Sequence, residues 1–332
     1  EASSTREYPC GSFLSSVLGF CGSDGSGIYG LEKSYDEELS GTPGRTISSE
    51  NAWGYELANE ESDTHDPING SNLHLTIDDN IQSVLETELS KAIEDYNVQN
   101  RGSAIVMNVK TGAIYGMATQ PQFDPNDPYA ITEPKLQAIL DNAGSALSAE
   151  EISTLQSRLG QDNVADLIAD GVIGTEPRTE VQDDGAEKEI SSEKVALQGM
   201  IREAQWKNKA VTELYYPGSV FKLMTAAAAL DSGLMDAGQQ FYCGGGLTVF
   251  EGTEWEHTYR CAEGSTHGWL DMAGALNESC NLYFIQAAEK MNPDFFYNYY
   301  QAFGLTQTTG IDLPFEAKGI SKTQQELEDV VT

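Results

Sequence analysis

The sequence has few basic residues and no long apolar run. Its 332 residues include 19 Lys and Arg against 52 Asp and Glu, which gives a formal net charge of −33. A surface of that charge repels nucleic-acid phosphates and anionic lipid headgroups, so both are excluded as electrostatic partners. No apolar stretch approaches the roughly 18 residues of a membrane span. Hydrophobic residues still make up 39% of the chain, which is enough for a packed core and excludes wholesale disorder.

Residues that commonly bind metals are also scarce. The chain has four histidines and five cysteines, and none of them forms an HExxH or CxxC motif. Five cysteines are too few for a disulfide scaffold. We therefore expect no metal site and no cofactor. The residues concerned are His65, His74, His257, His267, Cys10, Cys21, Cys243, Cys261 and Cys280.

The length allows about two domains, and the composition changes near residue 72. Residues 1–72 are rich in Gly, Ser and acidic residues with turn signals between them, which favours short extended segments and one small helix near 32–39. Residues 73–332 form the second predicted domain. Within it, the acidic stretch 131–203 is interpreted as a surface insertion with helical pieces and a polar, mobile segment at 175–189. A small helical subdomain is the alternative.

The second predicted domain opens with clear periodicity. Residues 73–77 alternate like a strand, Asp78 is a suitable cap for a helix over 81–96, and residues 104–118 are typical of a β-hairpin. The order strand, helix, hairpin predicts an α+β fold with an antiparallel sheet and helices, and not a parallel βαβ array.

A serine and a lysine stand out at the start of an apolar helix. Residues 215–222 read Tyr-Tyr-Pro-Gly-Ser-Val-Phe-Lys and lead into a helix that is apolar on every side, which predicts burial. Ser219 and Lys222 are three residues apart and share one face. Burial lowers the pKa of a lysine toward that of a useful base, and a helix start favours an alkoxide or oxyanion. The pair predicts acyl transfer without histidine.

An SxxK spacing is common by chance. The alternative is therefore a purely structural role, in which Ser219 caps the helix and the Lys222 side chain extends to the surface. A second element favours catalysis. Ser279 and Asn281 precede another helical run and are one residue apart, as in a loop whose hydroxyl and amide face one cleft. The combination of SxxK, Ser-x-Asn and Lys-Thr-Gly motifs occurs in penicillin-binding proteins and class A β-lactamases.

With these motifs the sequence resembles the class B penicillin-binding proteins, which are peptidoglycan DD-transpeptidases. The resemblance implies a serine-transpeptidase domain of the β-lactamase-like fold, preceded by part of a β-rich, dimerisation-type pedestal domain. It also implies a membrane-anchored protein with an extracytoplasmic catalytic domain. The matching segments are residues 30–44 in the pedestal and 75–82, 111–126, 206–210 and 309–314 in the transpeptidase domain.

The resemblance also implies a role for each motif residue. Ser219 would attack the penultimate D-Ala carbonyl of a stem peptide, Lys222 would be the base, and Ser279 would relay the proton to the leaving amine. Asn281 would hold the substrate amide. β-Lactam antibiotics would acylate Ser219 as mimics of D-Ala-D-Ala, and the partner would be a peptidoglycan glycosyltransferase of the elongation, division or sporulation machinery.

One family motif has no counterpart at its usual place. No Lys-Thr/Ser-Gly follows Asn281, and Lys110-Thr111-Gly112 lies before the nucleophile in a predicted hairpin turn, so we interpret it as a chance match. We therefore expect the chain to lack both a membrane anchor and the end of its catalytic domain. On this expectation the chain by itself is inactive or weakly active and is labelled poorly by penicillin.

The cysteines near the motifs allow two interpretations. A Cys261–Cys280 or Cys243–Cys261 disulfide would restrain the loop over the nucleophile in an oxidising compartment. Free cysteines are otherwise often just small buried hydrophobes. Cys10 and Cys21 allow the same two interpretations within residues 1–72.

Two other functional classes share part of the pattern. Serine β-lactamases and DD-carboxypeptidases have the same Ser-Lys and Ser-x-Asn motifs. Residues 1–72 argue against both classes, because these enzymes do not usually carry a pedestal domain. A non-catalytic β-lactam sensor or divisome scaffold would bind without turnover. The lifetime of a penicillin adduct separates them, because a β-lactamase hydrolyses it quickly.

Overall fold

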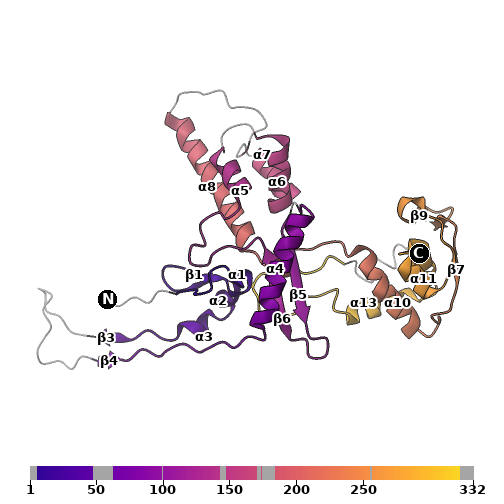
Figure 1. Ribbon diagram of the computed structural model, residues 1–332, viewed down its shortest axis with the longest axis horizontal. Coiled ribbons are helices and arrows are strands. Elements are labelled where there is room, and N and C mark those ends of the chain that lie inside the picture. The colour runs from indigo at the N-terminus through magenta and orange to yellow at the C-terminus, as the bar shows by residue number, and fades with distance from the viewer. Residues whose placement is uncertain are drawn as a thin grey trace, which may run out of the picture. The chain divides into compact units, whose positions relative to one another are not determined.

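The chain was analysed as a computed structural model, shown in Figure 1. The structure describes residues 6–47, 63–98, 100–142, 147–169, 173, 184–254 and 256–321. The chain divides into two compact units, the first made of residues 1–213 with Asp312–Phe315 and the second of residues 214–311 with 316–332. Among the described residues, no helix has the length and apolar character needed to cross a membrane.

The N-terminal part of the first unit consists of short elements, as its turn-rich composition predicts. Two antiparallel pairs, β1 with β2 and β3 with β4, accompany three short helices. The predicted helix near 32–39 is present as two helices, α2 and α3. The elements are α1 (Ser15–Leu18), β1 (Phe20–Cys21), β2 (Gly27–Tyr29), α2 (Gly30–Ser34), α3 (Asp36–Ser40), β3 (Arg45–Ile47) and β4 (Asp63–His65).

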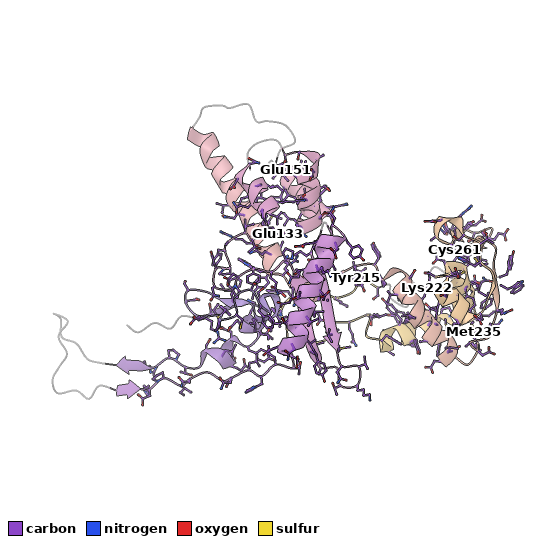
Figure 2. All side chains as sticks on the ribbon, in the orientation of Figure 1. Glu133, Glu151, Tyr215, Lys222, Met235 and Cys261 are labelled. Atoms are coloured by element: carbon purple, nitrogen blue, oxygen red, sulfur yellow. The ribbon has the colours of Figure 1, made fainter. Side chains whose placement is uncertain are left out.

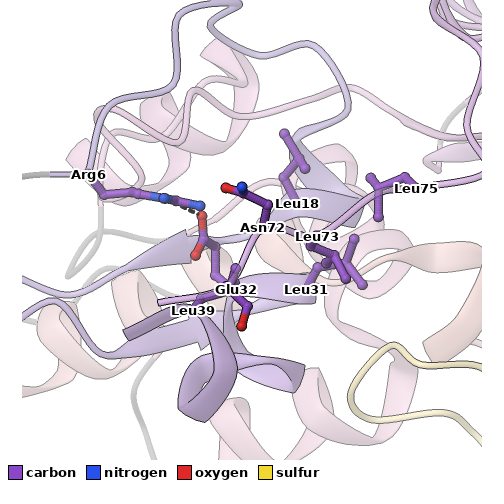
Figure 3. A pocket seen from close by; sticks show the side chains of 9 residues that line it. Arg6, Leu18, Leu31, Glu32, Leu39, Asn72, Leu73 and Leu75 are labelled. Carbon is purple, nitrogen blue, oxygen red and sulfur yellow. Dashed lines mark hydrogen bonds and ion pairs between the residues drawn. The ribbon is translucent and has the colours of Figure 1, made fainter. Parts of the chain in front are cut away.

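A small pocket lies among these N-terminal elements (Figure 3). Arg6 Nε donates to Glu32 Oε1 over 2.7 Å at its edge, and leucines such as Leu31 and Leu73 line the rest. The Glu32 side chain is largely buried, so its charge needs this partner. The pocket combines one ion pair with aliphatic walls and brings together no catalytic group.

A helix and a hairpin pack together in the first unit. Helix α4 (Asp79–Asp95) packs on the antiparallel hairpin of β5 (Gly102–Met107) and β6 (Ile114–Gln120). The predicted cap is confirmed, because the Asp78 carboxylate accepts from the N–H groups of Asn80 and Ile81 at 3.0 Å each. The predicted hairpin is also confirmed.

The predicted strand at 73–77 is wrong. The segment has no ladder of backbone hydrogen bonds. It is attached to β6 by the Thr76 hydroxyl, which donates to the Ile114 carbonyl at 2.6 Å, and by the Asp78 N–H, which donates to Tyr115 at 2.9 Å. The alternation of apolar residues in this segment therefore reflects an extended connection and not a strand.

Lys110-Thr111-Gly112 forms the turn between β5 and β6, as predicted. Gly112 has a φ of +77°, a left-handed conformation that glycine adopts without strain, and its N–H donates to the Asn108 carbonyl at 2.8 Å. These three residues belong to the first unit, whereas Ser219 belongs to the second.

The acidic stretch contains helices, as predicted. They are α5 (Pro134–Asp141), α6 (Ala149–Leu159), α7 (Gln161–Ala169) and α8 (Asp184–Trp206). The last of those described, α8, was not expected from the sequence. They share a core that includes Leu140, Leu155 and Leu197, which are almost fully buried. Most of the segment 175–189, predicted to be mobile, lies outside the described residues, and its last part begins α8. The short helix α9 (Lys209–Thr212) closes the first unit.

The second unit has alternating helices and short antiparallel strands. β7 pairs with β10, and β8 pairs with β9. These pairs, with the β5–β6 hairpin, confirm the predicted α+β class with antiparallel strands. The elements are η1 (Gly218–Val220), α10 (Phe221–Asp231), β7 (Phe241–Cys243), β8 (Gly246–Val249), β9 (His257–Arg260), η2 (Ala262–Gly264), β10 (Gly268–Leu270), α11 (Met272–Asn277), α12 (Asn281–Glu289) and α13 (Pro293–Ala302).

A buried glutamine offers a test of the first unit. The Gln82 amide accepts from Met117 N–H at 2.8 Å and donates to the Met117 carbonyl at 2.9 Å, which joins α4 to β6. Gln82→Leu would leave both backbone groups buried without a partner, so we expect the free energy of unfolding to fall by about 2–4 kcal/mol. Urea unfolding and hydrogen exchange of the hairpin measure this change. Val84→Ala, at an exposed site of the same helix, should stay within about 0.5 kcal/mol. Equal loss in both variants would contradict the argument.

Candidate active site

Ser219 lies in a tight turn at the start of α10. Pro217 and Gly218 precede it, and Gly218 has a φ of +56°. The 3₁₀ turn η1 then runs into α10, so Ser219 and Lys222 lie on consecutive helical turns. The side chain of Ser219 is exposed. The Pro-Gly turn therefore places Ser219 at a helix N-terminus, as the sequence predicts, but the residue is exposed and not buried.

The structure brings Ser219, Lys222 and Ser279 into one hydrogen-bonded triangle. Lys222 Nζ donates to Ser219 Oγ at 3.0 Å and to Ser279 Oγ at 2.8 Å. The Ser279 hydroxyl donates to Ser219 Oγ at 2.8 Å, although the two serines are 60 positions apart in the chain. Lys222 Nζ also donates to the Ser279 carbonyl at 2.7 Å. Figure 2 labels Lys222 on its helix in the second unit. All three hydroxyl and amine groups are therefore within reach for proton transfer.

Two effects act on the pKa of Lys222 in opposite directions, burial lowering it and negative charge on Cys261 and Cys280 raising it, and burial is the larger. Partial burial lowers the pKa of Lys222 below its ordinary value. Within the described part of the chain, no carboxylate forms an ion pair with Lys222 that would raise the pKa again. Lys222 Nζ donates to three uncharged oxygens, which is the pattern of the protonated ammonium, and loss of one proton leaves a lone pair beside both hydroxyls.

Ser279 projects from a strained turn between α11 and α12. Its φ of +50° is in the left-handed region, which is uncommon for a residue other than glycine and is often found at functional sites. The next residue, Cys280, is fully buried, and its sulfur accepts from Tyr283 N–H at 3.4 Å at the start of α12. The buried cysteine thus anchors the turn that holds the Ser279 hydroxyl outward.

Asn281 has a different neighbour from the other motif residues. Its Nδ2 donates to the Arg260 carbonyl at the end of β9, over 3.0 Å. The amide therefore connects α12 to β9. Among the described residues, no side-chain hydrogen bond joins Asn281 to Ser219, Lys222 or Ser279. Its predicted role toward a substrate stays a prediction.

The expectation that the nucleophile helix is buried on every side is wrong in part. Ala228 and Ala229 of α10 are fully buried against the core of the unit, but Leu223 and Leu230 are 59% and 43% exposed. The small alanines fit against α12, whereas the large leucines lie on the opposite face. An alanine-rich stripe, and not uniform apolarity, marks the packed face.

All five cysteines are free thiols in the structure. Cys10 is exposed, Cys21 is half-buried, and the other three gather in the second unit. The Cys243 and Cys261 sulfurs are 3.7 Å apart, and those of Cys261 and Cys280 are 3.6 Å apart. The two disulfides considered from the sequence therefore involve neighbouring but unbonded sulfurs.

Comparison with protein families finds two matches that together span most of the chain. The penicillin-binding protein transpeptidase domain matches residues 102–331, and the penicillin-binding protein dimerisation domain matches residues 1–75. Stage V sporulation protein D of Bacillus subtilis is 30% identical over 318 residues, covering 96% of this chain and 38% of the relative. Peptidoglycan D,D-transpeptidase FtsI of Escherichia coli is 24% identical over 330 residues, covering 98% of this chain and 42% of the relative.

Solved structures share the fold. A peptidoglycan synthetase from Bifidobacterium adolescentis aligns with a TM-score of 0.67 at 24% identity, covering 98% of this chain and 45% of that one. Penicillin-binding protein 3 of Mycobacterium tuberculosis, solved with ampicillin, aligns with a TM-score of 0.62 at 24% identity over 97% and 51% of the two chains. The chain spans about two-fifths of the length of the curated relatives named above.

The chain belongs to the penicillin-binding protein family, and the match to both the dimerisation and the transpeptidase domain confirms the resemblance to its class B members.

Proposed function

We propose that this member of the penicillin-binding protein family contributes the Ser-Lys-Ser centre of a peptidoglycan DD-transpeptidase. The observation that carries the proposal is the closed triangle of Ser219, Lys222 and Ser279. Two residues of the SxxK motif and one of the Ser-x-Asn motif meet there, although separate parts of the chain supply them. A serine that only capped the helix would not require this arrangement.

The acylation step follows from the hydrogen bonds of the triangle. Lys222, as the neutral amine, accepts the Ser219 hydroxyl proton while Oγ attacks the carbonyl carbon of the penultimate D-Ala. The peptide bond to the terminal D-Ala then breaks. Ser279, hydrogen-bonded to both groups, passes the proton from Lys222 to the leaving amine. The products are a Ser219 ester and free D-Ala.

The second half of the reaction uses the same residues in reverse. An amino group of a neighbouring stem peptide attacks the Ser219 ester and loses a proton through Ser279 to Lys222. The ester C–O bond breaks, and Lys222 returns a proton to Ser219 Oγ. A cross-link forms and the serine is regenerated. A β-lactam opens its ring on Ser219 in the first step and remains attached, so we expect these antibiotics to inhibit the protein covalently. The ampicillin complex of the M. tuberculosis relative supports this expectation.

The proposal extends to the organisation of the protein. Residues 1–72 are the dimerisation-type pedestal and residues 73–332 belong to the transpeptidase domain, with 131–203 inserted. We place the catalytic domain outside the cytoplasm on a membrane-anchored protein, and we propose a glycosyltransferase that supplies glycan strands as its partner. The match to both domains supports the organisation, and the likeness to peptidoglycan D,D-transpeptidase FtsI supports a place in cell-wall synthesis.

Covalent labelling tests the nucleophile. In the full-length protein we expect Ser219→Ala to abolish labelling by a fluorescent penicillin. In the described part of the chain, the hydroxyls that hydrogen-bond to Lys222 are those of Ser219 and Ser279, and the Ser279 hydroxyl is directed to Ser219 Oγ. Labelling is measured by gel fluorescence and peptide mapping. The control is Ser232→Ala, near the end of the same helix, which should label like the wild type.

The same experiment separates the alternative functions. A stable adduct supports the transpeptidase, whereas rapid release of hydrolysed penicillin would indicate a β-lactamase. A stable adduct without peptide cross-linking would indicate a sensor. Labelling that persists in Ser219→Ala would contradict the proposed nucleophile.

The pH dependence of acylation tests Lys222. Since the base must be neutral, the acylation rate should rise as the pH rises through the pKa of Lys222 and then level off. Burial lowers that pKa, so the rise should occur below the ordinary lysine value of about 10.4. Lys222→Arg keeps the charge but removes the base, and we expect acylation to slow about 10²–10⁴-fold. Stopped-flow acylation from pH 6 to 10 measures both effects. A wild-type rate in Lys222→Arg would contradict the assignment.

A further inference from the structure

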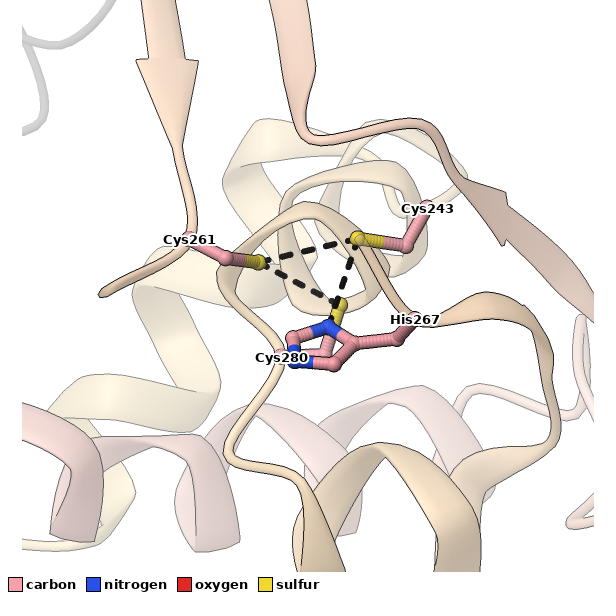
Figure 4. A group of neighbouring side chains, drawn as sticks. All are labelled: Cys243, Cys261, His267 and Cys280. Atoms are coloured by element: carbon pink, nitrogen blue, oxygen red, sulfur yellow. Dashed lines mark hydrogen bonds between the residues drawn. The ribbon is translucent and has the colours of Figure 1, made fainter. Parts of the chain in front are cut away.

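Three thiols and one imidazole converge beside the Ser279 turn (Figure 4). Cys243 ends β7, Cys261 follows β9, His267 precedes β10, and Cys280 precedes α12. The three Sγ atoms and a ring nitrogen of His267 all lie within 4.8 Å of one another. Four different segments of the second unit thus direct a metal-binding atom toward one point.

The distances fit the edges of a small tetrahedron. Bond lengths of about 2.3 Å to sulfur and 2.0–2.1 Å to nitrogen place neighbouring ligand atoms of a tetrahedral zinc site at about 3.8 Å for S–S and 3.6 Å for S–N. The observed sulfur separations are 3.7 and 3.6 Å, and Cys243 Sγ lies 3.4 Å from His267 Nδ1. The ligand atoms therefore already have nearly the spacing that a bound ion requires.

The surroundings of the sulfurs are typical of a closed site. Cys243, Cys261 and Cys280 are 1%, 4% and 0% exposed, and they pack in the core with Met272 and Ala275. Backbone N–H groups point at the sulfurs. Tyr283 N–H donates to Cys280. The backbone N–H groups of His267 and Gly245 point at the Cys243 sulfur. Donors of this kind stabilise thiolates and orient metal ligands.

Simple core packing does not explain the arrangement. A free cysteine often packs as a small hydrophobe. However, packing alone does not require three sulfurs to face one another, nor a half-buried imidazole to turn its Nδ1 toward them.

We propose that Cys243, Cys261, His267 and Cys280 form a structural Zn²⁺ site. Three sulfurs and one nitrogen are a ligand set that zinc uses in closed tetrahedral sites, where all four positions come from the protein. Each cysteine releases its proton to solvent when it binds the ion, and neutral His267 binds through Nδ1. No oxidation or reduction is involved. The site does not depend on the proposed transpeptidase function.

A bound ion would restrain the turn that carries Ser279. Cys280 lies between Ser279 and Asn281, so an ion bound to its sulfur would tie the turn to β7, β9 and the segment before β10. The ion would also keep Cys261 and Cys280 from pairing as a disulfide. Zinc would then fix the position of the Ser279 hydroxyl.

Metal content tests the site directly. We would purify the 332-residue chain under reducing conditions without an immobilised-metal column and measure metals by inductively coupled plasma mass spectrometry. The proposal expects about one zinc per chain in the wild type and nearly none in Cys261→Ser or His267→Gln. Cys21→Ser is the matched control, because it removes a partly buried thiol from the first unit, and it should keep the zinc.

Cobalt binding to the wild type provides a second test of the site. This test needs no variant, so it still applies if the substituted proteins do not fold. After the zinc is removed with a chelator, Co²⁺ should give the intense visible bands of a tetrahedral ion and a thiolate charge-transfer band. Zinc should then bleach both. Thiol counting in the same sample establishes that the cysteines are reduced.

Three results would overturn the proposal. The first is a fully reduced wild type that binds neither zinc nor cobalt. The second is zinc binding that survives in folded Cys261→Ser and His267→Gln. The third is a Cys261–Cys280 or Cys243–Cys261 disulfide that persists under reducing conditions, since it would remove two ligands and assign these cysteines a redox role.

Discussion

The packing of α10 against α12 is the contact on which the site depends. Ser219 and Lys222 belong to one helix and Ser279 directly precedes the other, so the triangle exists only while these helices hold their spacing. Small residues make that spacing short: Ala228 and Ala229 on α10 and Ala287 on α12 are fully buried in the same core. The aromatic ring of Tyr283 fills the remaining volume, and its hydroxyl donates to the Gln239 carbonyl at 2.9 Å. A larger side chain at any of these three alanines would push the helices apart. The triangle would then be broken although Ser219, Lys222 and Ser279 themselves were unchanged.

The turn before α12 combines two opposite requirements in two adjacent residues. Ser279 must reach outward to Lys222, whereas Cys280 must be buried as the cap of the helix. The left-handed conformation of Ser279 bends the chain at this turn, with the Ser279 hydroxyl directed to Lys222 and the Cys280 side chain directed to the core. That conformation costs free energy in a residue with a Cβ atom, so the surrounding contacts must compensate. The buried Cys280 sulfur and the bond from Asn281 to Arg260 are the contacts that do so.

Local sequence signals predicted the elements that local interactions determine. The Asp78 cap, the β5–β6 hairpin and the Ser219 turn each depend on a few neighbouring residues, and each is present. The 73–77 segment shows the limit of periodicity, because alternation cannot distinguish a strand from an extended connection that lacks a hydrogen-bonding partner. The burial of α10 shows another limit. Its composition is apolar on all sides, yet only the alanine face meets a neighbouring helix, and which face does so depends on α12, more than 50 residues later. The motif spacing indicated the catalytic chemistry, but the meeting of Ser279 with Lys222 is a tertiary contact that no local pattern specifies.

The cysteine cluster shows the same limit most clearly. Metal sites are usually found in sequences by short ligand spacings such as CxxC, in which two ligands come from one turn. Here consecutive sulfurs are separated by 18 and 19 positions, and each of the four ligands comes from a different segment. His267 carried no signal, because a single histidine in a polar loop is ordinary. Such a site can form only after the strands and α12 have packed, so an ion bound there would stabilise the folded second unit and not nucleate it. The free energy of binding would therefore act on the Ser279 turn, the strained part of the proposed catalytic centre, because Cys280 is both a proposed ligand and the residue that anchors that turn.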